Sequence, residues 1–191
     1  MLCRGQVETA PSRRLKDQTM KFLKIVSNGI DKLNTYSGLW ISLLAVPMIL
    51  ALIYEVVARY GFNKPTIWSY EATYMIYGTH FLIGSAYTLK IKGHIKIEVL
   101  YSFLSVRARA VVDLLGYLLL FFPVIIIMIF AAWDMALDAY VSKEVSQYTP
   151  LKPILWPFKG VVFIGFFLLC LQGVSETCKA IIILITGKEV E

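Results

Sequence analysis

The sequence predicts an all-α integral membrane protein with four transmembrane helices and both termini on the cytoplasmic side. Hydrophobic residues make up 58% of its 191 residues, and its mean hydropathy of +0.66 is too high for a surface that faces water. Four long apolar segments, separated by unevenly charged connections, complete the prediction. We therefore expect one membrane domain over residues 20–186, between a polar, disordered tail at 1–19 and a short cytoplasmic tail at 187–191.

Each apolar segment is long enough to cross the hydrocarbon core of a bilayer. The first contains nineteen uncharged residues from Tyr36 to Tyr54, which as a helix would rise about 28 Å against a core of about 30 Å. Pro47, Pro123 and Pro157 lie within or beside the spans, where membrane helices accept proline with a local bend. The four predicted spans cover about residues 36–58, 66–89, 110–137 and 154–175.

The distribution of Lys and Arg predicts the orientation, because cytoplasmic connections of membrane proteins are enriched in both. Fourteen of the 19 lie before the first span, between the second and third spans, or at the C-terminal end. The other five are Arg59, Lys64, Lys143, Lys152 and Lys159. This bias accounts for the net charge of +6 without nucleic acid, since the basic residues form no continuous stripe. At the edges of the fourth span, Lys159 and Glu176 are expected to reach the lipid headgroups by snorkelling.

Two connections have the periodicity of amphipathic helices that lie on the inner leaflet. One precedes the first span and the other joins the second and third spans; an ordinary linker with chance periodicity is the alternative. The apolar positions are Phe22, Val26, Ile30 and Leu33 in the first connection, and Ile97, Leu100, Tyr101 and Leu104 in the second. Met20, which follows the polar tail, is an alternative start of the chain.

Acidic residues in a membrane are costly and each needs an explanation. Glu55 and Arg59 are four residues apart and can pair on one helix face, either as an interfacial salt bridge or as a site for a solute or ion. Glu71 lies about one turn inside the second span. There it can interact favourably with the dipole of its helix N-terminus, accept a hydrogen bond from a partner subunit, or relay protons.

The second span also carries small residues seven apart, which predicts a face that another helix can approach closely. Gly78 and Ser85 follow Glu71 at this spacing. His80 lies on roughly the opposite side of the same helix. It could ligate haem, but the only other histidine, His94, lies beyond the span, so a haem with two histidine ligands at one depth is not expected.

No catalytic site, cofactor or metal site is predicted. Asp134 and Asp138 lie four apart at the outer end of the third span, but two carboxylates alone make a poor cation site. We interpret them, with Asp113, as charges at the ends of the span. The chain contains no P-loop sequence and no nucleophile next to a plausible base. Its three cysteines have no spacing that suits zinc.

A motif of the form R-x-x-F-x-x-P-x-x-W-x-x-E begins at Arg59 and ends at Glu71. Its inner positions are Phe62, Pro65 and Trp68, and Gly84 and a Gly-His-Ile sequence containing His94 follow. With the four-span layout over about residues 20–186, this motif resembles the small DctQ-type membrane subunit of tripartite ATP-independent periplasmic (TRAP) transporters.

The resemblance implies a small permease subunit in a bacterial or archaeal inner membrane. It would brace a large DctM-type permease subunit and help to dock a periplasmic DctP-type solute-binding protein. Ion gradients would drive uptake of an organic acid such as a dicarboxylate. The resemblance implies structural or partner-contact roles for Arg59, Phe62, Pro65, Trp68, Glu71, Gly84 and His94, to which the packing face adds Gly78 and Ser85. Two alternatives are a self-sufficient multidrug-type transporter with Glu55 or Glu71 as proton carrier, and a haem-bearing membrane anchor.

Overall fold

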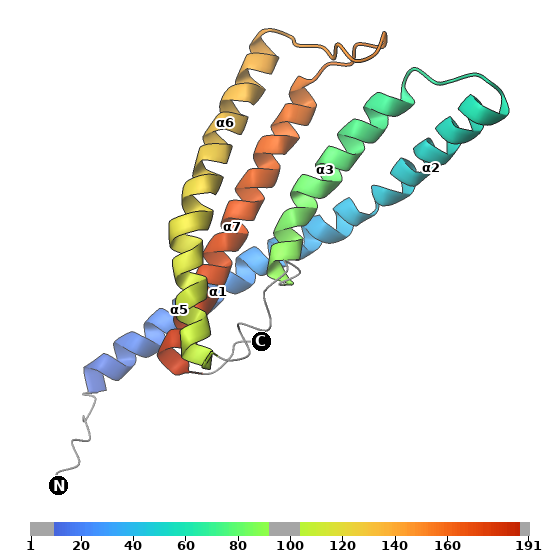
Figure 1. Ribbon diagram of the computed structural model, residues 1–191. Coiled ribbons are helices and arrows are strands. Elements are labelled where there is room, and N and C mark those ends of the chain that lie inside the picture. Colours follow the sequence, from blue (N-terminus) through green and yellow to red (C-terminus); the bar gives the residue numbers. More distant parts are fainter. Residues whose placement is uncertain (1–9, 92–103, 188–191) are drawn as a thin grey trace.

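The computed structural model describes residues 10–91 and 104–187, and these form a bundle of helices (Figure 1). No strand occurs in these two ranges, apart from one isolated antiparallel bridge between Val145 and Ile154. The predicted all-α class is therefore confirmed for the described part of the chain. The elements are α1 (Ala10–Ser42), α2 (Ala45–Val56), the π-helical turn η1 (Val57–Gly61), α3 (Ser69–Lys90), α5 (Val106–Gly116), the π-helical turn η2 (Tyr117–Phe121), α6 (Phe122–Val141) and α7 (Trp156–Thr186).

Three stretches are long and apolar enough to cross a membrane: Gln18–Gly61, Val106–Val141 and Trp156–Thr186. Helix α3 is also long, with 22 residues, but it does not reach the same apolarity. Its Tyr, Thr, Ser, Gly and His residues lower its hydropathy. The structure thus supports three of the four predicted spans by length and composition.

Helix α1 is longer than the sequence suggested. It begins at Ala10, inside the segment expected to be a tail, and continues through residue 36, where we had placed the start of the first span. The helix is interrupted only at Leu43 and Leu44. Pro47 explains this position, because it has no N–H to donate to the Leu43 carbonyl four residues earlier. The bend predicted at Pro47 is therefore a break between α1 and α2.

The other two prolines are accommodated within or at the start of a helix. Pro123 follows η2, where the Phe122 N–H donates to the carbonyl of Tyr117 five residues back. This π-helical turn keeps α5 and α6 in one continuous helix, although Pro123 has no backbone N–H to donate. Pro157 lies in the first turn of α7, where no intrahelical donor is needed.

Helix α7 lies at the centre of the bundle and packs against α1, α3, α5 and α6, while α2 packs against α3 (Figure 1). Glycines allow the closest of these approaches. A Cβ atom added at Gly165 of α7 would lie 2.8 Å from Leu82 Cβ of α3. One added at Gly78 of α3 would lie 2.7 Å from the Phe158 ring of α7. The predicted small-residue face thus includes a close helix approach, and here the second helix belongs to the same chain.

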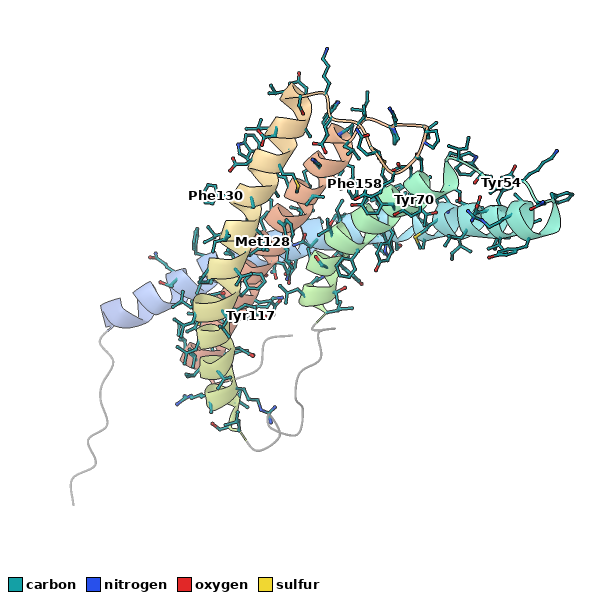
Figure 2. All side chains as sticks on the ribbon, turned by 45° about the horizontal axis from the view of Figure 1, so that its top comes forward. Tyr54, Tyr70, Tyr117, Met128, Phe130 and Phe158 are labelled. Atoms are coloured by element: carbon teal, nitrogen blue, oxygen red, sulfur yellow. The ribbon has the colours of Figure 1, made fainter. Side chains whose placement is uncertain are left out.

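The bundle is polar inside and apolar outside. Its buried apolar residues are mainly alanines, whereas large side chains such as Leu120 and Phe130 are exposed. Phe130 projects outward from α6 (Figure 2). Several buried side chains are polar, among them Asn34, Glu71 and Gln172. Because small residues and polar contacts join helices in lipid, this arrangement is typical of a chain surrounded by hydrocarbon.

Helix α1 illustrates this inversion. Ser27 and Asn34 are buried and Asp31 is half-buried on the side that meets α7, whereas Phe22 and Ile25 are exposed. The predicted amphipathic segment is therefore helical, but its lysines and some of its apolar side chains are both exposed, and the side that meets α7 carries polar residues. The second predicted amphipathic segment, except for Leu104, lies outside the described residues.

Candidate functional site

A cluster of buried polar side chains joins α1 to α7 where the two helices cross. We call it the α1–α7 joint. At its centre, the Gln172 amide donates to Asp31 Oδ1 at 2.9 Å and to Glu176 Oε1 at 3.2 Å, and its Oε1 accepts from Asn34 Nδ2 at 2.7 Å. The members are Ser27, Asp31 and Asn34 of α1, and Gln172, Ser175, Glu176 and Lys179 of α7.

One ammonium group bridges the two carboxylates of the joint. Lys179 Nζ lies 2.7 Å from Asp31 Oδ2 and 2.6 Å from Glu176 Oε1. Glu176 is only 5% exposed, so its expected snorkelling to the headgroups is wrong. Helix α7 continues to Thr186, beyond the end expected for the fourth span, and this extension carries Lys179 to Asp31. Buried carboxylates are tolerated when such pairing and hydrogen bonding compensate for lost hydration.

At the opposite end of the bundle, Glu55 fastens the connection between α2 and α3. Its Oε1 accepts a 2.8 Å hydrogen bond from Arg59 Nε, which confirms the predicted pairing on one helix face. Its Oε2 accepts from the backbone N–H of Thr66 at 3.0 Å and also from the Thr66 hydroxyl. Glu55 thus closes the turn that follows η1, and both of its oxygens are engaged within the chain.

Glu71 fastens the α6–α7 loop, residues 142–155, in a similar way. It lies in the first turn of α3 and is 2% exposed. Its Oε1 accepts hydrogen bonds from the hydroxyls of Ser146 and Thr149, the latter at 3.0 Å. Its Oε2 is buried and has no hydrogen-bond partner in the described part of the chain. The Glu71 carboxylate therefore binds the α6–α7 loop of the same chain.

The α6–α7 loop has a defined shape. The Ser146 N–H donates to the Pro153 carbonyl at 2.9 Å, and the Leu155 N–H donates to the Glu144 carbonyl at 3.0 Å. The Glu144 side chain pairs with Lys159 of α7 at 2.5 Å. In Figure 1 the loop extends from the end of α6 over α7 toward α3, where Glu71 holds it.

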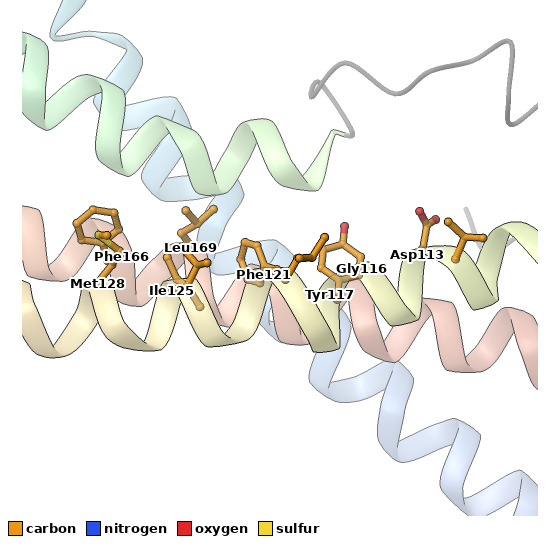
Figure 3. A pocket seen from close by; sticks show the side chains of 11 residues that line it. Asp113, Gly116, Tyr117, Phe121, Ile125, Met128, Phe166 and Leu169 are labelled. Carbon is orange, nitrogen blue, oxygen red and sulfur yellow. The ribbon is translucent and has the colours of Figure 1, made fainter.

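An apolar groove of about 630 Å³ runs along α5, η2, α6 and α7 (Figure 3). Its walls include the π turn through Tyr117 and Phe121, and its floor includes Phe166 and Leu169. Asp113 lies near one end, so this predicted end-of-span charge lines the groove. A groove with this composition suits hydrocarbon and offers little that could orient a polar solute.

The remaining motif residues lie on the α2–α3 loop or on α3. Trp68 stacks on Tyr54 with ring centroids 5.9 Å apart, while Phe62 and Pro65 are exposed on the α2–α3 loop. Nothing lies within 4 Å of a Cβ added at Gly84. The Ser85 hydroxyl donates to the Leu82 carbonyl at 2.6 Å. His80 is half-buried, Asp134 and Asp138 are exposed on α6, and His94 lies outside the described residues.

The hydrogen bonds and ion pairs described above engage four acidic residues within the chain: Asp31, Glu55, Glu71 and Glu176. Both candidate proton carriers, Glu55 and Glu71, accept hydrogen bonds from their own loops. Within residues 10–91 and 104–187, no group of three His, Cys, Asp or Glu side chains could hold a metal ion. The arrangement can fix loops and join helices, which is the work of a scaffold.

A family model described as "Tripartite ATP-independent periplasmic transporters, DctQ component" matches residues 48–182. The chain belongs to the DctQ family. No match was found among curated proteins or solved structures. This DctQ chain is therefore a small permease subunit of a TRAP transporter, a class of transport proteins and not of enzymes. The matched region includes Glu55 and Glu71 with the loops that they hold, which we call the loop clamps, and the α7 half of the joint. The α1 half of the joint, from Ser27 to Asn34, precedes the matched region.

Sequence reasoning missed the joint. The sequence indicates for Glu176 only a charge at the edge of the fourth span. Ser27 and Ser175, whose hydroxyls lie 2.9 Å apart, are 148 residues apart in the chain. The only local signal was a polar pair, Gln172 and Glu176, one turn apart at the end of an apolar helix.

Proposed function

We propose that this DctQ subunit braces the large permease subunit and helps to dock a periplasmic solute-binding protein during ion-driven uptake of an organic acid, such as a dicarboxylate. The family match over residues 48–182 carries the proposal. The engagement of Glu55 and Glu71 in loop clamps supports it, because a scaffold needs fixed loops. The transported acid and the coupling ion would then be handled by the partner subunits.

The proposal includes four spans, with α3 as the second, and cytoplasmic termini in the inner membrane. Two features support it: the fourteen-to-five distribution of Lys and Arg, and the position of the α2–α3 and α6–α7 loops at one end of the bundle (Figure 1). The exposed Phe22 and Ile25 suit contact of the first half of α1 with the inner leaflet. A reporter enzyme that works only in the cytoplasm, fused after Glu191, should be active; activity of an exported reporter would contradict this topology.

For the bracing surface we favour the exposed side of α3. Tyr77 and Phe81 are exposed there, and their rings stack with centroids 6.2 Å apart. Gly84 follows at helical spacing with open space around it. Because a glycine lets another backbone approach closely, this side of α3 suits a helix of the large subunit.

The test is co-purification in mild detergent. A tagged wild-type chain should bring down a much larger multi-span protein, and deletion of the chain should abolish uptake. Gly84→Leu should weaken recovery of the partner by about tenfold, because a branched side chain would separate the helices. Gly29→Leu is the matched control, since this glycine of α1 also has nothing within 4 Å. Recovery of the chain alone, with uptake intact after its deletion, would reject the proposal.

A further inference from the structure

Three lysines lie on the two loops at the outer end of the bundle. Lys64 belongs to the α2–α3 loop, and Lys143 and Lys152 belong to the α6–α7 loop; all three are exposed. We call them the cationic rim. None of the three side chains has a hydrogen bond or ion pair with the residues that the structure describes. They are also on the side where cationic residues are disfavoured in membrane proteins, so they need an explanation.

The three glutamates on or next to these loops are engaged within the chain. Glu55 and Glu71 turn inward to the loop hydroxyls, and Glu144 pairs with Lys159. Two exposed carboxylates, Asp134 and Asp138, are also present at this end. They lie on α6 itself, before its end at Val141, and not on the loops. The one acidic residue on the two loops themselves, Glu144, is thus paired with Lys159, and the three lysines of the loops are exposed.

The backbone of the two loops is ordered at the rim. Lys143 and Lys152 have φ angles of 51° and 45°, and Asn63, next to Lys64, has a φ of 52°. Residues with a Cβ adopt this left-handed region at some cost in free energy, and they do so where the surrounding structure imposes a turn. Hydrogen bonds impose it here: the Lys64 N–H donates to the Ala58 carbonyl at 2.9 Å, and the Lys152 N–H donates to the Thr149 carbonyl at 3.3 Å. A loop backbone that is already ordered loses less conformational entropy when a partner binds.

An exposed aromatic residue, Tyr148, lies on the α6–α7 loop between Lys143 and Lys152 in the sequence. Tyr148 is 75% exposed at the α6–α7 loop. Its ring packs against Tyr70 of α3 with centroids 6.3 Å apart. Tyrosines are enriched at protein interfaces and among the residues that contribute most to binding. Loop positions beyond the helix ends also favour a water-soluble partner over lipid headgroups, which side chains on helix flanks reach more readily.

We infer that the cationic rim and Tyr148 form a docking surface for an acidic patch on a water-soluble protein. This inference rests on the proposed docking role, and it specifies the chemistry of that role: the periplasmic solute-binding protein presents carboxylates to Lys64, Lys143 and Lys152. Charge complementarity of this kind mainly accelerates association and makes binding sensitive to salt.

The test uses the complete transporter in nanodiscs of phosphatidylcholine and the purified solute-binding protein of the same transporter. Binding is measured by biolayer interferometry at several salt concentrations. The triple variant Lys64→Gln, Lys143→Gln, Lys152→Gln should raise the Kd by about tenfold at low salt, mainly through a slower association rate, and should flatten the salt dependence. The control is Lys21→Gln, Lys24→Gln, Lys32→Gln, which removes the same charge from exposed positions of α1 and should bind like the wild type.

The outcomes separate this inference from the proposed function. Equal affinity and equal salt dependence of the triple variant and the wild type would overturn the inference alone. If the wild-type complex binds no solute-binding protein, the proposed docking role itself fails. If the triple variant differs from the wild type only in nanodiscs that contain anionic phosphatidylglycerol, the rim contacts lipid and the inference is likewise overturned.

Discussion

Replacing Lys179 with Met should lower the melting temperature of the purified protein by about 6–20 °C. Lys179 Nζ is the bridge between Asp31 and Glu176, whose side chains are 16% and 5% exposed. Without it, two carboxylates are left close together in a site that excludes water. Breaking a buried ion pair in this way costs about 3–5 kcal/mol, and 1 kcal/mol shifts the melting temperature of a chain of this size by about 2–4 °C. Tryptophan fluorescence during heating in detergent gives the measurement.

Two further variants show whether charge or packing is responsible. Lys24→Met removes an exposed lysine of α1 and should leave the melting temperature within about 2 °C of the wild type. The triple variant Asp31→Asn, Glu176→Gln, Lys179→Met removes all three charges and should recover most of the loss, because no unpaired carboxylate remains. A Lys179→Met protein as stable as Lys24→Met would contradict the bridge.

Replacing Glu71 with Ala should release the α6–α7 loop while the helices stay folded. Ser146 is fully buried and donates to Glu71 Oε1, as does Thr149. Without this acceptor the buried Ser146 hydroxyl can still accept from the Tyr148 N–H at 3.3 Å but has no acceptor for its own proton. Such a loss costs about 1–3 kcal/mol, so local opening should increase about tenfold or more. Trypsin detects it by cleavage after Lys143, whereas Lys152 is followed by Pro153, which blocks the enzyme. The cleavage rate is the quantity to compare.

Matched variants sharpen this experiment. Glu71→Gln keeps an oxygen acceptor of the same reach, so its cleavage rate should stay near that of the wild type. Asp138→Ala removes an exposed carboxylate of α6 at the same end and should also have little effect. If Glu71→Ala is cleaved no faster than Asp138→Ala, the carboxylate does not hold the loop.

Interactions that are local in sequence were predictable. Glu55 and Arg59 are four residues apart, and helix geometry alone brings them together. The apolar runs also predicted the spans at about 36–58, 110–137 and 154–175, which overlap the three stretches that are long and apolar enough to cross a membrane. Local rules were less reliable at Pro47, where the helix breaks although a bend was expected.

Interactions between distant segments were not predictable from a single sequence. The partners of Glu71 lie 75 and 78 residues away, so nothing near it indicated that it holds a loop of its own chain. Gly78 was expected to allow a close approach, but only the structure shows that Phe158 of α7 fills the space. Helix α1 is the strongest case, since its alternation of polar and apolar residues does not reveal which side meets protein.

The α1–α7 joint also constrains the order in which this protein assembles during biosynthesis. Ribosomes deliver α1 first and α7 last, and the residues that pair across the joint are 138 to 148 positions apart. Until α7 is complete, Asp31 and Asn34 on the nascent chain have none of their α7 partners and disfavour the hydrocarbon. Helix α1 can pack against α3 earlier, but the α1–α7 joint can form only after the last helix has been inserted.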